Sequence, residues 1–263
     1  MIRHAALTLL IAVVPCSGSV RAQDVPDDVI RADLLPGWRN PDGTRTAALH
    51  LSLAPGWHTY WRSPGEAGIP PRFDWTGSRN LASVAFRWPQ PQVFDQNGLR
   101  TLGYTGEVIL PFDVTAAADG PITLNATIDL GVCDTICVPV TVSVTGDLSQ
   151  GSGRDPAILA AIDTVPARRD DLAGCSIEPI RDGLRLTMRV DTASLGPDEF
   201  TVIEMPGTEI WASTSTDTRS GATLSAVADL VPPDAQPFAL DRSRVRMTLF
   251  GGGKAVEING CKG

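Results

Sequence analysis

Short runs of alternating or β-branched residues recur along the chain, and clusters of turn-forming residues separate them. The clearest runs of the first half are RTAALHLSLA (45–54), VILPFDVT (108–115), ITLNATIDL (122–130) and CVPVTVSVTG (137–146). Runs of this length and periodicity predict β-strands, and regular turns between them favour antiparallel pairing in a sandwich. Strands do not alternate with helical segments, so a thioredoxin-like fold is not expected. We therefore predict an all-β protein.

The strand-like runs form two sets, which predicts two domains. The second set follows Gly174 and comprises CSIEPI, GLRLTMRVD, FTVIEM, ATLSAVADL and RVRMTLFGGGKAVEING. The stretch between the sets has a flexible start, a short helical pattern at 156–163 and a charged end, which is typical of an interdomain connection. We predict a first antiparallel β-sandwich at 23–150, a linker with a short helix at 151–173, and a second β-sandwich domain at 174–263.

The first 22 residues have the pattern of a secretory signal peptide. Arg3 and His4 precede an apolar run, and Val20-Arg21-Ala22 matches a signal-peptidase site, so cleavage is expected after Ala22. The apolar run is too short for a membrane-spanning helix, and no later segment approaches the roughly 20 apolar residues that a span needs. We expect an exported protein that does not span the membrane.

The charge balance excludes one class of partner. Removal of residues 1–22 takes away Arg3 and Arg21, so that 20 basic side chains face 30 acidic ones and the net charge is −10. Such a surface repels phosphate backbones, and no basic cluster offsets the repulsion. Nucleic acid is therefore not expected as a partner.

Four cysteines remain after the signal peptide is removed. They are Cys133, Cys137, Cys175 and Cys261. An even number in an exported protein suggests two disulfides, for which three connectivities exist. A bond between Cys175 and Cys261 would tie the start of the second domain to its end, with a loop-closure effect of about 4–5 kcal/mol. We assign this pair a structural role, which leaves Cys133 and Cys137 with each other.

The Cys133–Cys137 pair has three interpretations: a redox centre, a structural brace or a metal clip. As a brace it would contribute only about 2 kcal/mol, because it closes five residues of a hairpin that already holds its ends together. Short, exposed disulfides are readily reduced, which favours redox exchange. A zinc site needs two further ligands, and the mature chain has only His50 and His58 as histidines. Cu(I) accepts few soft ligands and stays an alternative.

The surroundings of the pair predict a slow nucleophile. In CxxC oxidoreductases a helix N-terminus helps to lower the pKa of the thiol, whereas here the pair lies in a hairpin. Asp134 within the loop and Asp129 before it would disfavour a thiolate. The pair is thus expected to carry electrons between more activated partners. No cofactor is needed, because the cysteines themselves carry the electrons.

Three ordered blocks resemble a known family. GWHTYWRSPGEAGIPP (56–71), WPQPQVFDQNGLRTLGYTGEVILP (88–111) and GVCDTICVPV (131–140) are similar to the periplasmic N-terminal domain of the DsbD thiol–disulfide interchange reductases, and most similar to the ScsB, or suppressor of copper sensitivity, branch. The resemblance covers residues 40–146. It implies an immunoglobulin-like fold with the cysteine pair at one edge.

The resemblance also implies roles for individual residues. Cys137 would form the mixed disulfide with partner proteins. Phe94 and Asp95 lie in the block that corresponds to a cap loop, and Tyr60 and His58 would line the same site. The best-known DsbD proteins have a longer gap between their cysteines than this chain has. Tyr60 also belongs to an aromatic cluster with Trp57, Trp61 and Trp75, and such a cluster is more typical of a sandwich core than of a site.

The predicted function is periplasmic thiol–disulfide interchange. The resemblance implies that Cys133 and Cys137 pass reducing equivalents between a membrane-embedded or thioredoxin-like donor and periplasmic clients. The chain ends at Gly263 with neither a membrane electron-transfer domain nor a thioredoxin domain, so separate proteins are expected to complete the relay. Two alternatives stay open: a Cu(I)-binding or copper-tolerance protein that uses the same thiolates, and a structural adaptor braced by two disulfides.

Overall fold

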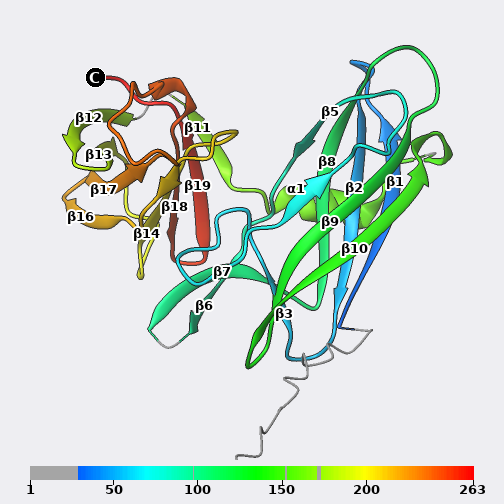
Figure 1. The fold of residues 1–263 in the computed structure, drawn as a ribbon, viewed down its shortest axis with the longest axis horizontal. Coiled ribbons are helices and arrows are strands. Elements are labelled where there is room, and N and C mark those ends of the chain that lie inside the picture. Colours follow the sequence, from blue (N-terminus) through cyan, green and yellow to red (C-terminus); the bar gives the residue numbers. More distant parts are fainter. Residues whose placement is uncertain (1–28, 97, 152, 171–172) are drawn as a thin grey trace, which may run out of the picture.

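The structure is a computed structural model that describes residues 29–96, 98–151, 153–170 and 173–263. The predicted signal peptide and its cleavage site lie outside these residues. Within the described part of the chain, no helix is long and apolar enough to cross a membrane. Figure 1 shows two pairs of sheets side by side, with the C-terminus in the second pair.

The first domain consists of two antiparallel sheets. Their strands are β1 (Ile30–Arg39), β2 (Arg45–Leu53), β3 (His58–Tyr60), β4 (Arg72–Asp74), β5 (Leu81–Phe86), β6 (Gln92–Gln96), β7 (Leu99–Thr105), β8 (Glu107–Ala116), β9 (Thr123–Cys133) and β10 (Cys137–Asp147). One sheet has the order β1-β2-β8-β5. The other has the order β10-β9-β3-β7-β6, and β4 also pairs with β9. Side chains of both sheets meet in one core, as in a sandwich.

The second domain also consists of two sheets. Its strands are β11 (Ala167–Asp170), β12 (Ala173–Ile180), β13 (Gly183–Asp191), β14 (Phe200–Glu204), β15 (Trp211–Ala212), β16 (Thr216–Ser220), β17 (Thr223–Val231), β18 (Arg246–Gly251) and β19 (Lys254–Asn259). One sheet has the order β11-β19-β18-β14. The other has the order β12-β13-β17-β15, and β16 also pairs with β17. Only β11 and β19 pair in parallel among the described strands. The predicted all-β fold of antiparallel sandwiches is confirmed.

The connection between the domains carries short elements of its own. The 3₁₀ helix η1 (Leu148–Gln150) is followed by α1 (Pro156–Asp163), whose N-terminus is capped by the side chain of Asp155. Strand β11, within the predicted linker, joins the second domain by pairing with β19. A further 3₁₀ helix, η2 (Arg242–Arg244), precedes β18.

Alternation along the strands explains the cores. In β9 the residues Leu124, Ala126, Ile128 and Leu130 are buried, and the residues between them are partly or fully exposed. This period of two places one face of the strand on the core and the other at the surface. The alternation stops at the end of β9, where Gly131, Val132 and Cys133 are all buried.

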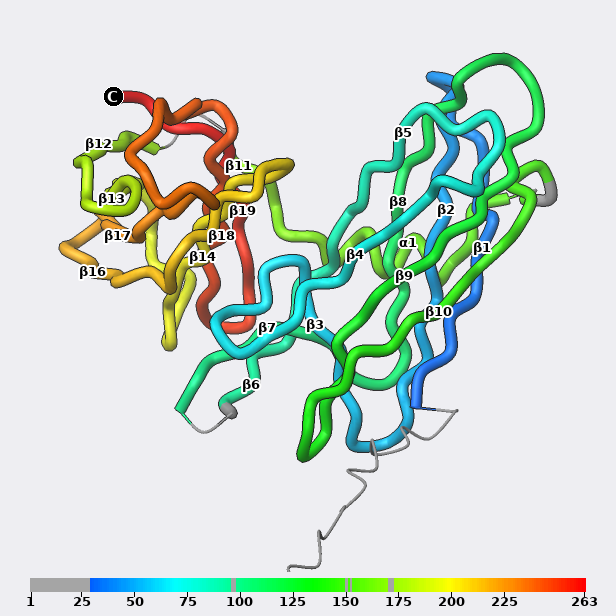
Figure 2. The backbone as a smooth tube through the Cα atoms, in the orientation of Figure 1, coloured from blue at the N-terminus to red at the C-terminus, as the bar shows by residue number. Residues whose placement is uncertain are grey.

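The sheet β11-β19-β18-β14 is buried on both faces. Ile203, Met247 and Ile258 belong to the core of the second domain. Phe200 and Phe250, from the same strands, belong instead to the core of the first domain. The two domains therefore share a hydrophobic contact, and Figure 2 shows that the loop between β3 and β4 runs toward this sheet.

Candidate functional site

The hairpin of β9 and β10 carries the first cysteine pair at its tip. Cys133 ends β9 and Cys137 begins β10, and the two face each other in the strand register. They form a disulfide with a Cα–Cα distance of 4.1 Å. Cys133 has 0 % of its surface exposed, whereas Cys137 is exposed. Partner molecules can therefore reach Cys137, whereas Cys133 is covered by the protein.

Tyr60 contacts both sulfurs of the pair. Its hydroxyl oxygen lies 2.8 Å from Sγ of Cys133 and 3.2 Å from Sγ of Cys137. Strand β3 brings Tyr60 there because it pairs with β9 at the cysteine end. Burial raises the pKa of Tyr60, so the phenol stays protonated at neutral pH and can donate a hydrogen bond to sulfur. A donor at this position stabilises a thiolate more than a disulfide, because hydrogen bonds to charged acceptors are the stronger ones.

The position of Tyr60 beside the sulfurs depends on Gly131 and Ile69, two residues that the sequence analysis did not identify. Gly131 lies two residues before Cys133, and a Cβ there would approach the side chain of Ile69 to 2.6 Å and the ring of Tyr60 to 3.0 Å. Only glycine leaves room for both side chains to lie against β9 at this point. No pattern in the sequence indicates this close approach, because Gly131 and Ile69 are far apart along the chain.

The predicted cap residue Phe94 lies against His58, whose backbone pairs with Cys133. Phe94 of β6 stacks on His58 of β3, with ring centroids 4.7 Å apart and an interplanar angle of 23°. His58 in turn meets Tyr60 edge to face, with centroids 5.5 Å apart. The three rings form a layer in which Phe94 and His58 support Tyr60. These contacts bring the three predicted aromatic residues together, and Tyr60 is the one that contacts the sulfurs.

Asp95 has a different place from its neighbour Phe94. Its side chain is exposed, and Oδ1 accepts a hydrogen bond from the backbone N–H of Gly98 at 2.9 Å. The carboxylate therefore holds the turn that joins β6 to β7. It shapes the hairpin that carries Phe94.

His58 is a buried histidine next to the disulfide. Its backbone pairs with Cys133 on one side and Thr105 on the other. Burial lowers the pKa of His58 below the usual 6.5, and the negative charge of Asp134 opposes this shift. The imidazole is thus neutral at pH 7 within the closed layer of rings.

The two acidic residues near the pair are both exposed. Asp129 accepts a hydrogen bond from the hydroxyl of Thr141 at 2.7 Å. Asp134 lies in the turn between the cysteines, where its backbone N–H bonds to the carbonyl of Ile136 at 3.2 Å. Their charges are consistent with the prediction of a slow nucleophile, although solvent weakens them.

The second disulfide joins Cys175 and Cys261, with a Cα–Cα distance of 5.6 Å. The backbone N–H of Cys175 also bonds to the carbonyl of Lys262 at 2.7 Å, and that of Lys262 to the carbonyl of Ala173 at 2.9 Å. This disulfide thus ties the start of β12 to the C-terminal segment, which is the structural position predicted for it.

The tryptophans of the aromatic cluster pack in the core. Trp61 is fully buried, and Trp57 and Trp75 are partly buried against the same core. Groups of three or more His, Cys, Asp or Glu side chains able to hold a metal ion do not occur among the described residues. His50 of β2 pairs with Glu107 of β8, and both lie in the sheet that does not carry the cysteines.

Comparison with known proteins agrees with this geometry. Residues 31–148 match the family described as the N-terminal domain of the thiol:disulfide interchange protein DsbD. Residues 31–148 of the first domain are therefore similar to a DsbD N-terminal domain. The matched residues include the cysteine pair, Tyr60 and the predicted cap residue Phe94, and the match supports a role in thiol–disulfide interchange. No curated protein matches the chain.

A solved structure extends the similarity to both domains. The N-terminal periplasmic domain of ScsB from Proteus mirabilis is 24% identical, with a TM-score of 0.61, over 89% of this chain and 92% of that chain. At this identity the likeness concerns the fold. The fold of both domains together therefore also occurs in that part of ScsB.

Proposed function

We propose that this protein is a periplasmic carrier of reducing equivalents that works by thiol–disulfide exchange at Cys133 and Cys137. A membrane-embedded or thioredoxin-like protein would reduce the pair, and the pair would reduce thioredoxin-like proteins or other clients of the periplasm. The secretory pattern at the N-terminus supports export, and the match of residues 31–148 to the DsbD N-terminal domain family supports the chemistry. The relay depends on partners that supply and accept two electrons at a time.

The exchange proceeds in two substitutions at sulfur. The thiolate of Cys137 attacks one sulfur of the client disulfide, which forms a mixed disulfide and releases the other client sulfur as a thiolate. The thiolate of Cys133 then attacks Sγ of Cys137. This step forms the Cys133–Cys137 disulfide and releases the client as a dithiol once its thiolates are protonated. The client gains the two electrons that the cysteine pair loses.

The observation that carries this proposal is that the two cysteines differ in exposure while one tyrosine hydroxyl contacts both sulfurs. Cys137 is exposed and Cys133 is buried, so an incoming sulfur can align with Cys137 only. The Tyr60 hydroxyl lies within reach of both sulfurs and would stabilise whichever thiolate is present at each step. The ring layer of Phe94 and His58 keeps small oxidants from the pair between encounters.

Trapping of the mixed disulfide tests the proposal. In the Cys133→Ser variant the resolving thiol is gone, so a Cys137-linked complex with a thioredoxin-like protein should accumulate. The Cys137→Ser variant should form little complex. Non-reducing electrophoresis of periplasmic extracts, with mass spectrometry of each band, measures both. Cys261→Ser is the matched control: it also leaves one unpaired cysteine, Cys175, and should trap nothing.

Other outcomes would favour other functions. Trapping through Cys133, or equal trapping by both variants, would refute the assignment of Cys137. The absence of any complex would favour a structural role for both disulfides. If the reduced protein instead binds one Cu(I) that protects both thiols from alkylation, and a variant unable to exchange disulfides still confers copper tolerance, the carrier function would be wrong.

A further inference from the structure

The two segments that frame the cysteine pair also contact the second domain. Trp61, which directly follows Tyr60, is fully buried, and its ring meets Phe250 of β18 edge to face at a centroid distance of 5.6 Å. Phe250 stacks on Phe200 of β14 at 4.8 Å. The end of β3 is therefore packed against the second domain one residue beyond the tyrosine that contacts the sulfurs.

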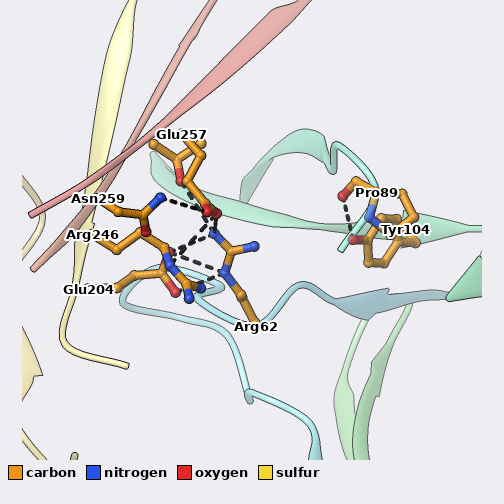
Figure 3. A network of polar contacts seen from close by, with 8 residues as sticks. Arg62, Pro89, Tyr104, Glu204, Arg246, Glu257 and Asn259 are labelled. Atoms are coloured by element: carbon orange, nitrogen blue, oxygen red, sulfur yellow. Dashed lines mark hydrogen bonds and ion pairs between the residues drawn. The ribbon is translucent and has the colours of Figure 1, made fainter. Parts of the chain in front are cut away.

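Arg62 extends this contact with a buried ionic network (Figure 3). Its guanidinium lies 4.1 Å from the centroid of the Trp61 ring. Nε and Nη2 donate to the carboxylate of Glu204 at 3.0 Å each, and Nη2 also donates to Glu257 at 2.8 Å. Only 11% of the Arg62 side chain is exposed, with 12% for Glu204 and 18% for Glu257.

The network is more than a surface ion pair. Glu257 also contacts Asn259, whose side-chain amide donates to it at 3.3 Å, and Arg246, at 3.7 Å. Charges this well covered lose much of their hydration, so a pair of this kind contributes less to stability than to fixing one arrangement of its partners. Here the arrangement that it fixes is the position of β3 relative to β14 and β19.

A second contact joins the hairpin of β6 and β7, which carries Phe94, to the second domain. The guanidinium of Arg100, on β7, lies 4.1 Å from the ring centroid of Phe200. In the register of β6 and β7, Arg100 faces Asp95, and the next position along β7, Thr101, faces Phe94. The strand that carries the cap is thus paired with a strand whose side chain stacks on the second domain.

The segments that carry Arg62 and Arg100 are themselves joined by backbone contacts. After Arg62 the loop returns to β7, where the carbonyl of Pro64 accepts the N–H of Leu102 at 3.0 Å. Gly65 approaches β7 so closely that a Cβ would lie 2.5 Å from the carbonyl oxygen of Arg100. The hydroxyl of Tyr104 donates to the carbonyl of Pro89 at 2.7 Å and holds the segment that leads into β6 (Figure 3).

We propose that the second domain is a platform that positions the redox site, with Arg62 and Arg100 as the positioning residues. Arg62 holds Tyr60 against the sulfurs through the end of β3, and Arg100 holds the cap through β7. The proposed exchange function explains why such positioning would be useful. The contacts of Arg62 and Arg100 do not depend on it, because no partner protein takes part in them. Release of the platform would loosen both the tyrosine and the cap.

The test measures access to the disulfide in the full chain, without any partner protein. A small phosphine attacks a disulfide sulfur directly, so its rate of reducing Cys133–Cys137 reports how far the cap is open. Arg62→Met removes the network and should raise this rate about tenfold. The largely covered carboxylates of Glu204 and Glu257 then have no Arg62 partner, which favours separation of β3 from the second domain. Arg100→Ala removes only an exposed stack and should raise it about threefold. Arg62→Lys, which keeps the charge without the bidentate geometry, should lie between wild type and Arg62→Met.

A potential and a matched control distinguish positioning from general destabilisation. Arg62→Met should shift the reduction potential of the pair in the same direction as Tyr60→Phe, and the double variant should show less than the sum of the two shifts. Arg185→Ala removes an ion pair with Asp229 that lies within the second domain, and it should leave rate and potential unchanged.

Several results would overturn the platform. Wild-type rates in both Arg62→Met and Arg100→Ala would do so, as would equal acceleration by Arg185→Ala. Additive potential shifts would show that Arg62 does not act through Tyr60. Arg100→Ala keeps the test decisive if Arg62→Met fails to fold, because Arg100 is exposed. Failure of client trapping would contradict the proposed function without affecting these measurements.

Discussion

The two disulfides of this protein lie in opposite kinds of surroundings. Cys133–Cys137 closes five residues at an exposed hairpin tip, under a tyrosine hydroxyl and a layer of aromatic rings. Cys175–Cys261 joins positions 86 residues apart, next to backbone hydrogen bonds that hold the same two segments. The first pair therefore has access and a hydrogen-bond donor but closes a short loop. The second closes a long loop and has no such donor among its described contacts. We thus assign thiol–disulfide exchange to Cys133 and Cys137, and stabilisation of the fold to Cys175 and Cys261.

Removal of each disulfide should give the largest difference between the two regions. Replacement of Cys175 and Cys261 by serine should lower the free energy of unfolding by about 4 kcal/mol, since the long loop is no longer closed in the unfolded chain. Replacement of Cys133 and Cys137 should lower it by at most about 2 kcal/mol. Urea unfolding of both double variants measures this. Equal losses would break the comparison.

Tyr60→Phe should sharpen the redox side of the comparison. The ring stays in place, but the thiolate loses its hydroxyl donor, so the reduced form becomes less stable. The equilibrium constant with a reference dithiol should change about tenfold toward the disulfide, which corresponds to a potential lower by about 30 mV. Equilibration of the Cys133–Cys137 pair with a dithiol buffer measures it. The potential of Cys175–Cys261 serves as the internal control, and an equal shift there would contradict the role of Tyr60.

The cap should have a smaller effect of the opposite kind. Phe94→Ala removes the stack on His58 and exposes the sulfurs, so small oxidants should react with the reduced pair about fivefold faster. Val93→Ala is the matched control, because Val93 is the exposed neighbour on the same strand. Stopped-flow oxidation measures both variants. An unchanged rate in Phe94→Ala would mean that the ring does not shield the pair.

His58 should give the cap a weak dependence on pH. Its pKa is below 6.5 in the closed layer because of burial, so the closed form takes up a proton less readily than an open one. Closure is therefore unaffected well above pH 6.5 and is progressively lost as the pH falls below that value. His58→Phe keeps the stack but does not titrate. The ratio of wild-type to variant phosphine reduction rates should rise about threefold from pH 7.5 to 5.5. A flat ratio would contradict this.

The sequence predicted what depends on local pattern. The period of two in 122–130 and 137–146 predicted the strands that became β9 and β10, and the aromatic block at 56–71 contained Tyr60. The residues that it did not predict act through contacts between distant segments. Gly131 matters because Ile69 and Tyr60 lie against it. Arg62 resembles an ordinary loop residue until the fold places Glu204 and Glu257 beside it. Such packing has no signature within a short stretch of sequence.

The most direct measurement of the central claim is a redox titration that follows both disulfides in the same molecule. The full chain is equilibrated across a series of dithiol buffers, the free thiols are alkylated, and mass mapping gives the fraction reduced at each cysteine. Access and loop size predict that Cys133–Cys137 opens at clearly less reducing conditions, while Cys175–Cys261 stays oxidised. Simultaneous opening of both bonds, or earlier opening of Cys175–Cys261, would contradict the assignment of exchange to the first pair.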